Sequence, residues 1–247
     1  MLRAVSAFGA KRHTVASESA TVSAKGWVQM GAVAVLAGEV RAEGVGKTID
    51  ETTLLLPTDV SADPGECIVL RGPNGSGKTT LLRIIGGLLV PSTGTATIGG
   101  READERDRAV RAAVAALLGA PTTYRDLTLI DHLVLIDSTW GGEPATSDER
   151  SLALLDRLGI AHLDDRFPHE LSSGQEQLFR LALTFSRPAS VVLLDEPEQR
   201  LDTAKRQVVA TLIGERTEAG GTVVMACHDP ELTATLATRV VDVVPAR

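Results

Sequence analysis

One stretch of the chain combines residue types and a spacing suited to binding the phosphates of a nucleotide. The fixed positions of the pattern G-x-x-x-x-G-K-[ST] are filled by Gly72, Gly77, Lys78 and Thr79. Glycines let backbone N–H groups turn toward phosphate oxygens, and a following helix N-terminus adds partial positive charge. Lys78 is expected to reach the β- and γ-phosphates of ATP, and the Thr79 hydroxyl to bind Mg²⁺. The candidate nucleotide-binding residues are Gly72, Pro73, Asn74, Gly75, Ser76, Gly77, Lys78, Thr79 and Thr80.

The residues on either side place this loop between a strand and a helix. Residues 67–70 form a short apolar run, as in a buried strand, and residues 81–85 have the character of a helix start. From average residue usage, a chance match in a chain of this length has a probability on the order of 1%. We therefore interpret residues 72–80 as a phosphate-binding loop rather than as a glycine-rich turn.

A second Gly-Lys-Thr sequence, at residues 46–48, lacks the rest of the pattern. Five residues before Gly46 stands Arg41 instead of a glycine, and no strongly apolar run leads directly into it. We interpret residues 44–48 as a turn.

Two carboxylates follow another apolar run. Residues 191–194 are all Val or Leu, as expected for a parallel strand covered on both faces, and Asp195 and Glu196 come directly after them. A carboxylate at the end of a buried strand needs a partner of opposite charge, and Mg²⁺ held by Thr79 and the phosphates is the natural partner for Asp195. Glu196 is placed to orient or polarise the attacking water in phosphoryl transfer. The alternative is a pair of carboxylates on an exposed strand end.

His228 follows a further expected strand, residues 222–226. Beside a phosphate-binding loop, its neutral imidazole could donate a hydrogen bond to the γ-phosphate; by itself it would be a structural histidine. Glu196 and His228 are thus the candidate catalytic residues. The other histidines show no ligand spacing: His13, His132, His162 and His169.

Ser172 and Gly174 stand just before an expected helix at residues 176–187. A serine there caps free N–H groups, and a glycine allows close backbone approach, so this helix start is a candidate second anion site. On its own it is also an ordinary helix cap.

Strands alternate with helices along the chain, which predicts an α/β fold with a largely parallel sheet and a ligand crevice at the carboxyl ends of its strands. The expected strands are residues 40–49, 53–60, 67–70, 95–98, 114–118, 191–194 and 222–226, with a turn at 63–66. One helix is expected to begin at residue 81. Further helices are expected at residues 127–136, 149–158 and 176–187, and a last helix and strand run to residue 244.

Composition narrows the class of protein. At 247 residues the chain is most simply one large domain, and residues 1–38 lack periodicity, as in a loosely ordered extension or an upstream-extended start before Met30. Its two cysteines exclude a disulfide framework and favour a reducing compartment. The net charge of −7 disfavours a general nucleic-acid binder, and no apolar run reaches the roughly 20 residues of a membrane helix.

Five features resemble, in their order and spacing, those of ATP-binding cassette ATPases. They are residues 72–79, Leu-Ser-Ser-Gly-Gln at 171–175, residues 191–196, Asp202 and His228. The resemblance covers about residues 40–244. It implies a P-loop NTPase fold in a domain spanning residues 39–247, with a mainly parallel core sheet, an N-terminal antiparallel β subdomain and a helical subdomain at about residues 120–175.

The resemblance also implies partners and an activity. Two such domains are expected to pair head to tail, so that Ser172, Gly174 and Gln175 of one close over ATP on the other, with Asp202 at the seam. ATP hydrolysis with Mg²⁺ would drive a separate transmembrane subunit, at the inner face of the cell membrane. Whether the second ATPase subunit is identical, and whether transport is import or export, stays open.

Three positions depart from the family pattern. Gly119 stands where the family usually has a glutamine, and Ile49 stands where an aromatic residue usually stacks on adenine. Residues 198–201 before Asp202 are not the usual small ones. These departures concern the contact with the base and the coupling of ATP hydrolysis to a partner, whereas the hydrolysis residues are intact.

Two alternatives to a transporter subunit exist. One is a soluble cassette ATPase that acts on a protein, a ribosome or DNA, although such relatives often carry two cassettes or a long inserted arm. The other is a nucleotide-binding regulator without turnover, which the presence of both Glu196 and His228 disfavours.

Overall fold

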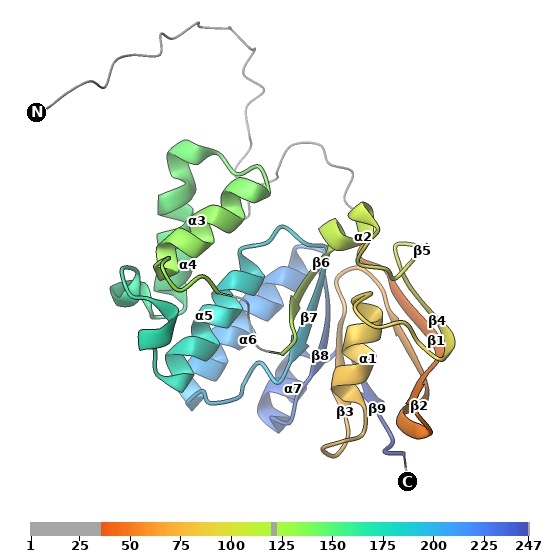
Figure 1. Cartoon of the computed structure of the whole chain (residues 1–247). Helices are drawn as coiled ribbons and strands as arrows, with labels where there is room; N and C mark the ends of the chain where they lie inside the picture. Colours follow the sequence, from red (N-terminus) through yellow and green to blue (C-terminus); the bar gives the residue numbers. More distant parts are fainter. Residues whose placement is uncertain (1–35, 120–122, 247) are drawn as a thin grey trace, which may run out of the picture. The chain divides into compact units, whose positions relative to one another are not determined.

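The computed structural model describes residues 36–119 and 123–246 (Figure 1). By internal contacts the chain divides into Met1–Ala32 and Val33–Arg247, and every described residue belongs to the second unit. The expected N-terminal extension, residues 1–38, therefore lies outside the described residues except for its last three. Within the described ranges, no helix combines the length and the apolar character needed to cross a bilayer.

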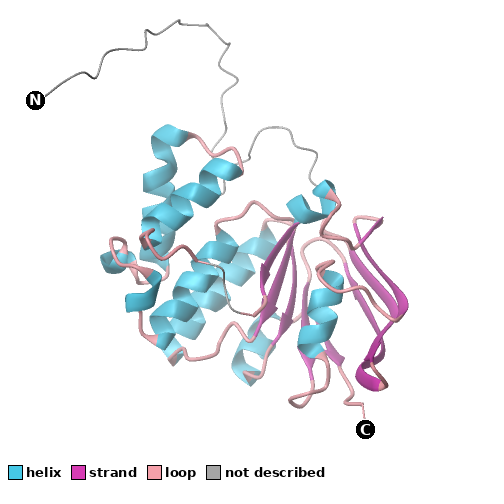
Figure 2. Ribbon diagram, viewed as in Figure 1, coloured by secondary structure: helices cyan, strands magenta, loops and turns pink. Residues whose placement is uncertain are grey.

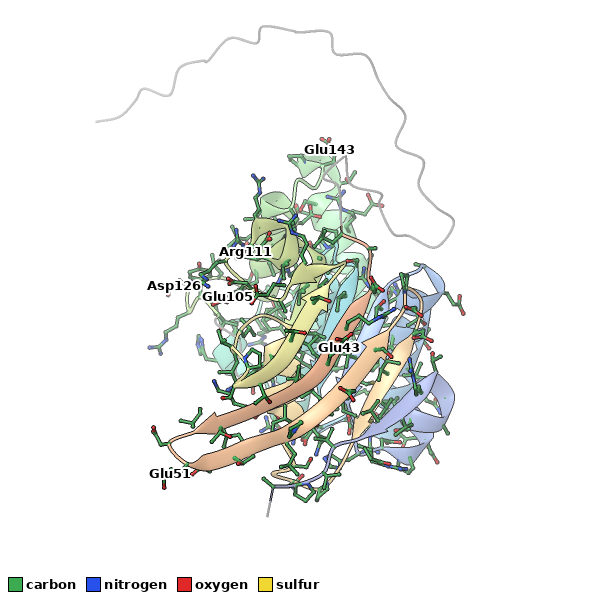
Figure 3. All side chains as sticks on the ribbon, turned by 90° about the vertical axis from the view of Figure 1, so that its right-hand side faces the viewer. Glu43, Glu51, Glu105, Arg111, Asp126 and Glu143 are labelled. Atoms are coloured by element: carbon green, nitrogen blue, oxygen red, sulfur yellow. The ribbon has the colours of Figure 1, made fainter. Side chains whose placement is uncertain are left out.

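An antiparallel sheet with the strand order β2-β1-β4-β5 forms one layer. Its strands are β1 (Val40–Ile49), β2 (Thr52–Ala62), β4 (Thr93–Ile98) and β5 (Arg101–Glu102). β1 pairs with β2 on one side and with β4 on the other, and Figure 3 shows Glu51 at the tip of the hairpin that β1 and β2 form. The strands expected at residues 40–49, 53–60 and 95–98 are thus confirmed.

The turn expected at residues 44–48 is wrong, because these residues lie inside β1. Val45 pairs with Thr58 of β2, and Gly46 pairs with Thr93 of β4, so both edges of the strand are occupied there. The register shifts on either side of Val45, which is how a strand accommodates glycine without reversing direction.

A parallel sheet with the strand order β6-β7-β8-β3-β9 forms the second layer. Its strands are β3 (Cys67–Arg71), β6 (Val114–Leu117), β7 (Val191–Asp195), β8 (Thr222–Ala226) and β9 (Arg239–Asp242), and every neighbouring pair is parallel. The carboxyl ends of these strands therefore meet at one edge. That edge brings together three segments distant in sequence, which follow β3, β7 and β8.

Helices cover both faces of the parallel sheet (Figure 2). α1 (Lys78–Ile85) lies between the two sheets, where its apolar face packs in a buried cluster with β1, β2, β3 and β7. α5 (Ser173–Phe185) and α6 (Thr203–Glu218) pack on the opposite face in a second cluster. Successive residues of β7 alternate between the two clusters, as in a strand buried on both sides.

The remaining helices are short or lie between residues 120 and 175, where the sequence predicts a helical subdomain. α3 (Leu129–Thr139) and α4 (Ser147–Arg157) pack against each other, and a capping box between Thr128 and Asp131 starts α3. The helices expected at residues 127–136 and 149–158 are confirmed with small shifts of their ends. The other elements are α2 (Arg108–Ala113), α7 (Pro230–Leu236) and three 3₁₀ turns at Pro144–Thr146, Ala161–Leu163 and Pro168–Glu170.

Candidate functional site

The loop after β3 wraps the start of α1, as the sequence predicts. Gly77 caps α1 with a φ of 100°, in the left-handed region, and a Cβ there would lie 2.6 Å from the carbonyl oxygen of Leu54. Gly72 is equally restricted, because a Cβ would collide with the carbonyl of Val243 and with Ser76. Only glycine fits at these two positions, which fixes the backbone close to the N-terminus of α1.

Two side chains of this loop are buried and oriented inward. Lys78 is 6% exposed, and its Nζ donates hydrogen bonds to the carbonyl oxygens of Gly72 at 2.8 Å and Pro73 at 3.1 Å. Ser76 is 1% exposed, and its hydroxyl has no hydrogen-bond partner among residues 36–119 and 123–246. A buried ammonium group and a buried, unsatisfied hydroxyl beside a helix N-terminus fit an anionic ligand that supplies oxygen acceptors.

Thr79 and Asp195 meet across the carboxyl edge of the sheet. The Thr79 hydroxyl donates a hydrogen bond of 2.7 Å to the Asp195 carboxylate, from the start of α1 to the end of β7. A hydroxyl and a carboxylate are oxygen ligands of the kind that Mg²⁺ takes, together with phosphates and water. Their placement fits Mg²⁺, although no group of three or more His, Cys, Asp or Glu side chains in the described ranges could hold a metal by itself.

Glu196 and His228 also lie together. The His228 Nε2 and the Glu196 Oε1 are 3.4 Å apart, and Gln199 donates a 2.8 Å hydrogen bond to the Glu196 Oε2. Glu196 has a φ of 50°, which a non-glycine residue adopts rarely. Its side chain reaches a cavity of about 380 Å³, lined by Thr53, Leu54, Asn74, Gly75, Gly77, Lys78, Thr79, Thr80 and Glu196.

The start of α5 is capped as the sequence predicts, but away from this cavity. Ser172 accepts a hydrogen bond from the Gln175 backbone, and the Gln175 side chain accepts one from the Ser172 backbone. A Cβ at Gly174 would lie 3.0 Å from the carbonyl oxygen of Arg200. None of these three residues lines the cavity beside Lys78 in the same chain.

Asp202 starts α6. Its carboxylate accepts a 2.9 Å hydrogen bond from the backbone of Lys205, and this bond lowers the pKa of Asp202. It too lies outside the cavity beside Lys78.

Two residues of β2, one polar and one aliphatic, line the side of the cavity next to the antiparallel sheet. They are Thr53 and Leu54, and Ile49 is not among them, although Ile49 is 46% exposed at the end of β1. The sequence interpretation named Ile49 and missed the other two. β2 borders the loop because the antiparallel sheet packs on α1. This packing brings the backbone of Leu54 close to Gly77.

Gly119 stands where the resemblance places a glutamine, and its backbone carbonyl accepts a hydrogen bond from an arginine of α5. Arg180 donates hydrogen bonds to the carbonyl of Gly119 and, at 3.1 Å, to the side chain of Gln177. Gln177 in turn donates to the carbonyl oxygens of Glu196 and Pro197, each at 3.2 Å. This chain of hydrogen bonds links the end of β6 to the backbone of Glu196, and partial burial lowers the pKa of Arg180.

The parallel sheet, the loop around Lys78 and the paired Thr79 and Asp195 define a nucleotide-binding protein of the P-loop NTPase class. Residues 55–199 match the family model described as ABC transporter. The chain belongs to the ABC transporter family.

Curated relatives are similar over most of this chain. The sulfate/thiosulfate import ATP-binding protein CysA of Brucella melitensis is 35% identical over 208 residues, covering 82% of this chain and 58% of that protein. The Fe(3+) ions import ATP-binding protein FbpC of Agrobacterium fabrum is 31% identical, covering 85% and 59%. A putative ABC transporter ATP-binding protein of Methanopyrus kandleri is 37% identical, covering 78% and 72%. The chain thus spans less than two thirds of the first two relatives.

Solved structures share the fold. An ATP-binding subunit of an ABC transporter superposes with a TM-score of 0.75 at 24% identity, covering 83% of this chain and 86% of that one. The dimeric bacterial ABC transporter cassette MJ0796 superposes with a TM-score of 0.73 at 23% identity, covering 82% and 94%. These likenesses confirm the α/β fold with its antiparallel and parallel sheets.

Proposed function

We propose that this chain is an ATP-binding and ATP-hydrolysing subunit that energises transport by a separate transmembrane subunit. The observation that carries the proposal is the 2.7 Å hydrogen bond between Thr79 and Asp195, directly beside the buried Lys78 and the cavity that Glu196 borders. Because these groups come from α1 and from the end of β7, only the folded chain brings them together. Two curated relatives named as import ATP-binding proteins support the same activity.

The phosphates of ATP bind at the start of α1. Lys78 exchanges its contacts with the loop carbonyls for phosphate oxygens, and the backbone N–H groups of residues 74–80 and the Ser76 hydroxyl supply further donors. Thr79 and Asp195 hold Mg²⁺, which when bound neutralises charge that develops on the phosphate oxygens.

Glu196 orients the attacking water, and His228 donates to the γ-phosphate. Their separation of 3.4 Å keeps the two side chains close enough to act on the same γ-phosphate. The chemistry needs little more, because phosphoryl transfer is catalysed mostly by positioning and electrostatic stabilisation.

A second ATPase subunit completes the site. Ser172, Gly174 and Gln175 lie outside the cavity of their own chain, at an exposed helix start whose partial positive charge suits a phosphate. In the proposed dimer this helix start closes over ATP bound to the other subunit, with Asp202 at the seam. The dimeric cassette among the structural neighbours supports a pairing of this kind.

The transmembrane subunit places the protein at the inner face of the cell membrane. Relatives named as import ATP-binding proteins support that location. A soluble ATPase that acts on a protein, a ribosome or DNA is the second candidate, and Gly119 favours it, because it stands where the resemblance to transporter subunits predicts a glutamine. Copurification of a polytopic membrane protein with the tagged chain supports transport, and its consistent absence supports the soluble alternative.

The test of the enzymatic core compares three variants with the wild-type protein. Glu196→Gln is expected to bind Mg-ATP, stop turnover and accumulate as a dimer, whereas Lys78→Ala loses binding. Glu231→Gln, at an exposed position on α7, is the matched control and keeps wild-type hydrolysis. Wild-type hydrolysis by Glu196→Gln contradicts the catalytic assignment, and a strictly monomeric ATP-bound form contradicts the proposed dimer.

A further inference from the structure

Two consecutive polar residues stand between the strand-end carboxylates and α6. Glu198 and Gln199 occupy positions where the resemblance predicts small residues. Each makes a hydrogen bond to one of the two candidate catalytic residues, Glu196 and His228.

Gln199 contacts the Glu196 side chain directly. Its Nε2 donates to the Glu196 Oε2 at 2.8 Å, while the other carboxylate oxygen faces the His228 ring at 3.4 Å. A hydrogen bond to an ionised group is stronger than one between neutral groups, so this bond restricts the carboxylate to one orientation.

Glu198 holds the backbone of His228. Its Oε1 accepts a 2.7 Å hydrogen bond from the His228 N–H, and its side chain is 7% exposed. Because His228 follows the end of β8 without a helix or strand of its own, this bond fixes where its side chain starts.

The turn itself does not need either side chain. The Gln199 N–H bonds to the Glu196 carbonyl, and the Leu201 N–H bonds to the Glu198 carbonyl, so backbone contacts already close residues 196–201. The two side chains are therefore available for a separate task.

We infer that Gln199 and Glu198 are positioning residues for hydrolysis: Gln199 orients the Glu196 carboxylate, and Glu198 places His228. This inference rests on the proposed function, since it assumes that Glu196 and His228 carry out hydrolysis. Glu196 and His228 are then held in place by residues of their own chain, before a second subunit binds.

The first experiment separates hydrogen bonding from shape at residue 199. Gln199→Ala removes the donor, and Gln199→Glu keeps the shape but places a second carboxylate against Glu196. We expect kcat to fall about 10- to 100-fold in Gln199→Ala and further in Gln199→Glu, with the KM for Mg-ATP within about twofold of wild type. Gln207→Glu, an exposed position on α6, is the matched control and keeps wild-type kinetics.

Which of the two Gln199 variants loses more kcat decides between a positioning role and a packing role. If the side chain served only to pack the turn, the isosteric Gln199→Glu would be the milder change, and that result overturns the inference, as does wild-type kcat in both variants. Crystal structures of the wild type and Gln199→Glu add a readout independent of turnover: the Glu196 carboxylate should rotate away from residue 199 in the variant, and an unchanged carboxylate also overturns the inference. Absence of hydrolysis in the wild type instead contradicts the proposed function, and the structures still test the contact.

A double-mutant cycle tests Glu198. Glu198→Gln keeps an oxygen acceptor and should retain activity within about threefold, whereas Glu198→Ala should lose about tenfold in kcat. If Glu198 acts through His228, the same substitution costs almost nothing in a His228→Ala background. Equal losses in both backgrounds, or a lower melting temperature that accounts for the whole loss, overturn this half of the inference.

Discussion

The two ends of the nucleotide cavity are built in different ways. At the phosphate end, Lys78 is 6% exposed, and Thr79 is hydrogen-bonded to Asp195. On the β2 side, Thr53 and Leu54 line the cavity, and Leu54 is 36% exposed; Ile49 of the same hairpin lies outside the lining and is 46% exposed. One end is a buried polar network, and the β2 side is a more open edge that includes an aliphatic side chain.

The difference predicts where the free energy of binding the proposed nucleotide comes from. Fixed donors and a buried ammonium group recognise phosphates whatever base they carry, since charge-assisted hydrogen bonds are the strong ones. An aliphatic side chain can cover the base but offers no aromatic face for stacking. The chain should therefore bind nucleoside triphosphates firmly and distinguish their bases poorly.

The largest expected effect is at Lys78. Lys78→Ala removes the buried cation from the phosphate end, and we expect the Kd for Mg-ATP to rise by about 100-fold or more, because each lost charge-assisted bond is worth about 1.5–3 kcal/mol. Isothermal titration calorimetry measures it. Lys47→Ala is the matched control, because Lys47 also follows glycine in a Gly-Lys-Thr sequence but lies in β1, where it bonds to the Val90 carbonyl. Equal losses in both variants would mean that the phosphate end is not the dominant anchor.

Thr79 should have the next largest effect. Thr79→Val removes the hydroxyl that bonds to Asp195 and keeps the shape of the side chain. ATP affinity should fall about tenfold with Mg²⁺ present and change little in EDTA, since one ligand oxygen is lost. Titration of a fluorescent ATP analogue under both conditions checks this, with Thr48→Val in β1 as control. A loss of equal size in EDTA would contradict a role in metal binding.

The base end should show a smaller effect with the opposite sign. We expect modest discrimination between ATP and GTP in the wild type, and adding an aromatic ring should tighten ATP binding by up to about tenfold, or 1.4 kcal/mol. Leu54→Tyr and Ile49→Tyr form the test, because Leu54 lines the cavity and Ile49 does not. Competition between ATP and GTP for a fluorescent analogue measures both variants. A strong ATP preference in the wild type, with no gain from either tyrosine, would show that another residue recognises the base.

The smallest effect concerns two buried thiols at opposite edges of the parallel sheet, of which only Cys227 lies at the carboxyl edge beside the phosphate end. Cys67 begins β3 and Cys227 precedes His228, and burial raises the pKa of each thiol to about 12. At pH 8 the thiolate fraction is on the order of one in ten thousand, so alkylation should require opening of the core. Mass spectrometry should show slow labelling that Mg-ATP slows a few-fold further, with denatured protein as control. Rapid labelling of Cys227 in the native protein would contradict a rigid phosphate end.

The phosphate end was predictable from the sequence, and the base end was not. Residues 72–80 are contiguous, so their spacing alone predicts the loop, and the apolar run 191–194 predicts where Asp195 lies. Leu54 and Gln199 carry no comparable pattern, because their contacts depend on how the hairpin packs on α1 and on how the chain turns after β7.

Two elements show why local patterns mislead. Residues 44–48 contain glycines typical of turns, and Gly44 has a φ of 58°, yet pairing with two neighbouring strands holds this stretch within β1. α6 was not named among the expected helices, because its apolar stripe is short: its buried residues are Val209, Leu212, Ile213 and, in the last turn, Arg216. In both elements, contacts with distant parts of the chain rather than the local pattern determine the conformation.

The distribution of aromatic rings has an optical consequence. Of the two tryptophans, Trp27 lies outside the described residues, and Trp140 ends α3 with the Arg187 guanidinium 4.7 Å from its ring. Among the described residues, no ring of Phe, Tyr or Trp lines the cavity beside Lys78. In a Trp27→Phe background, intrinsic emission therefore comes from the helical part of the chain, and a spectral change on adding ATP reports movement around α3 rather than stacking on the base.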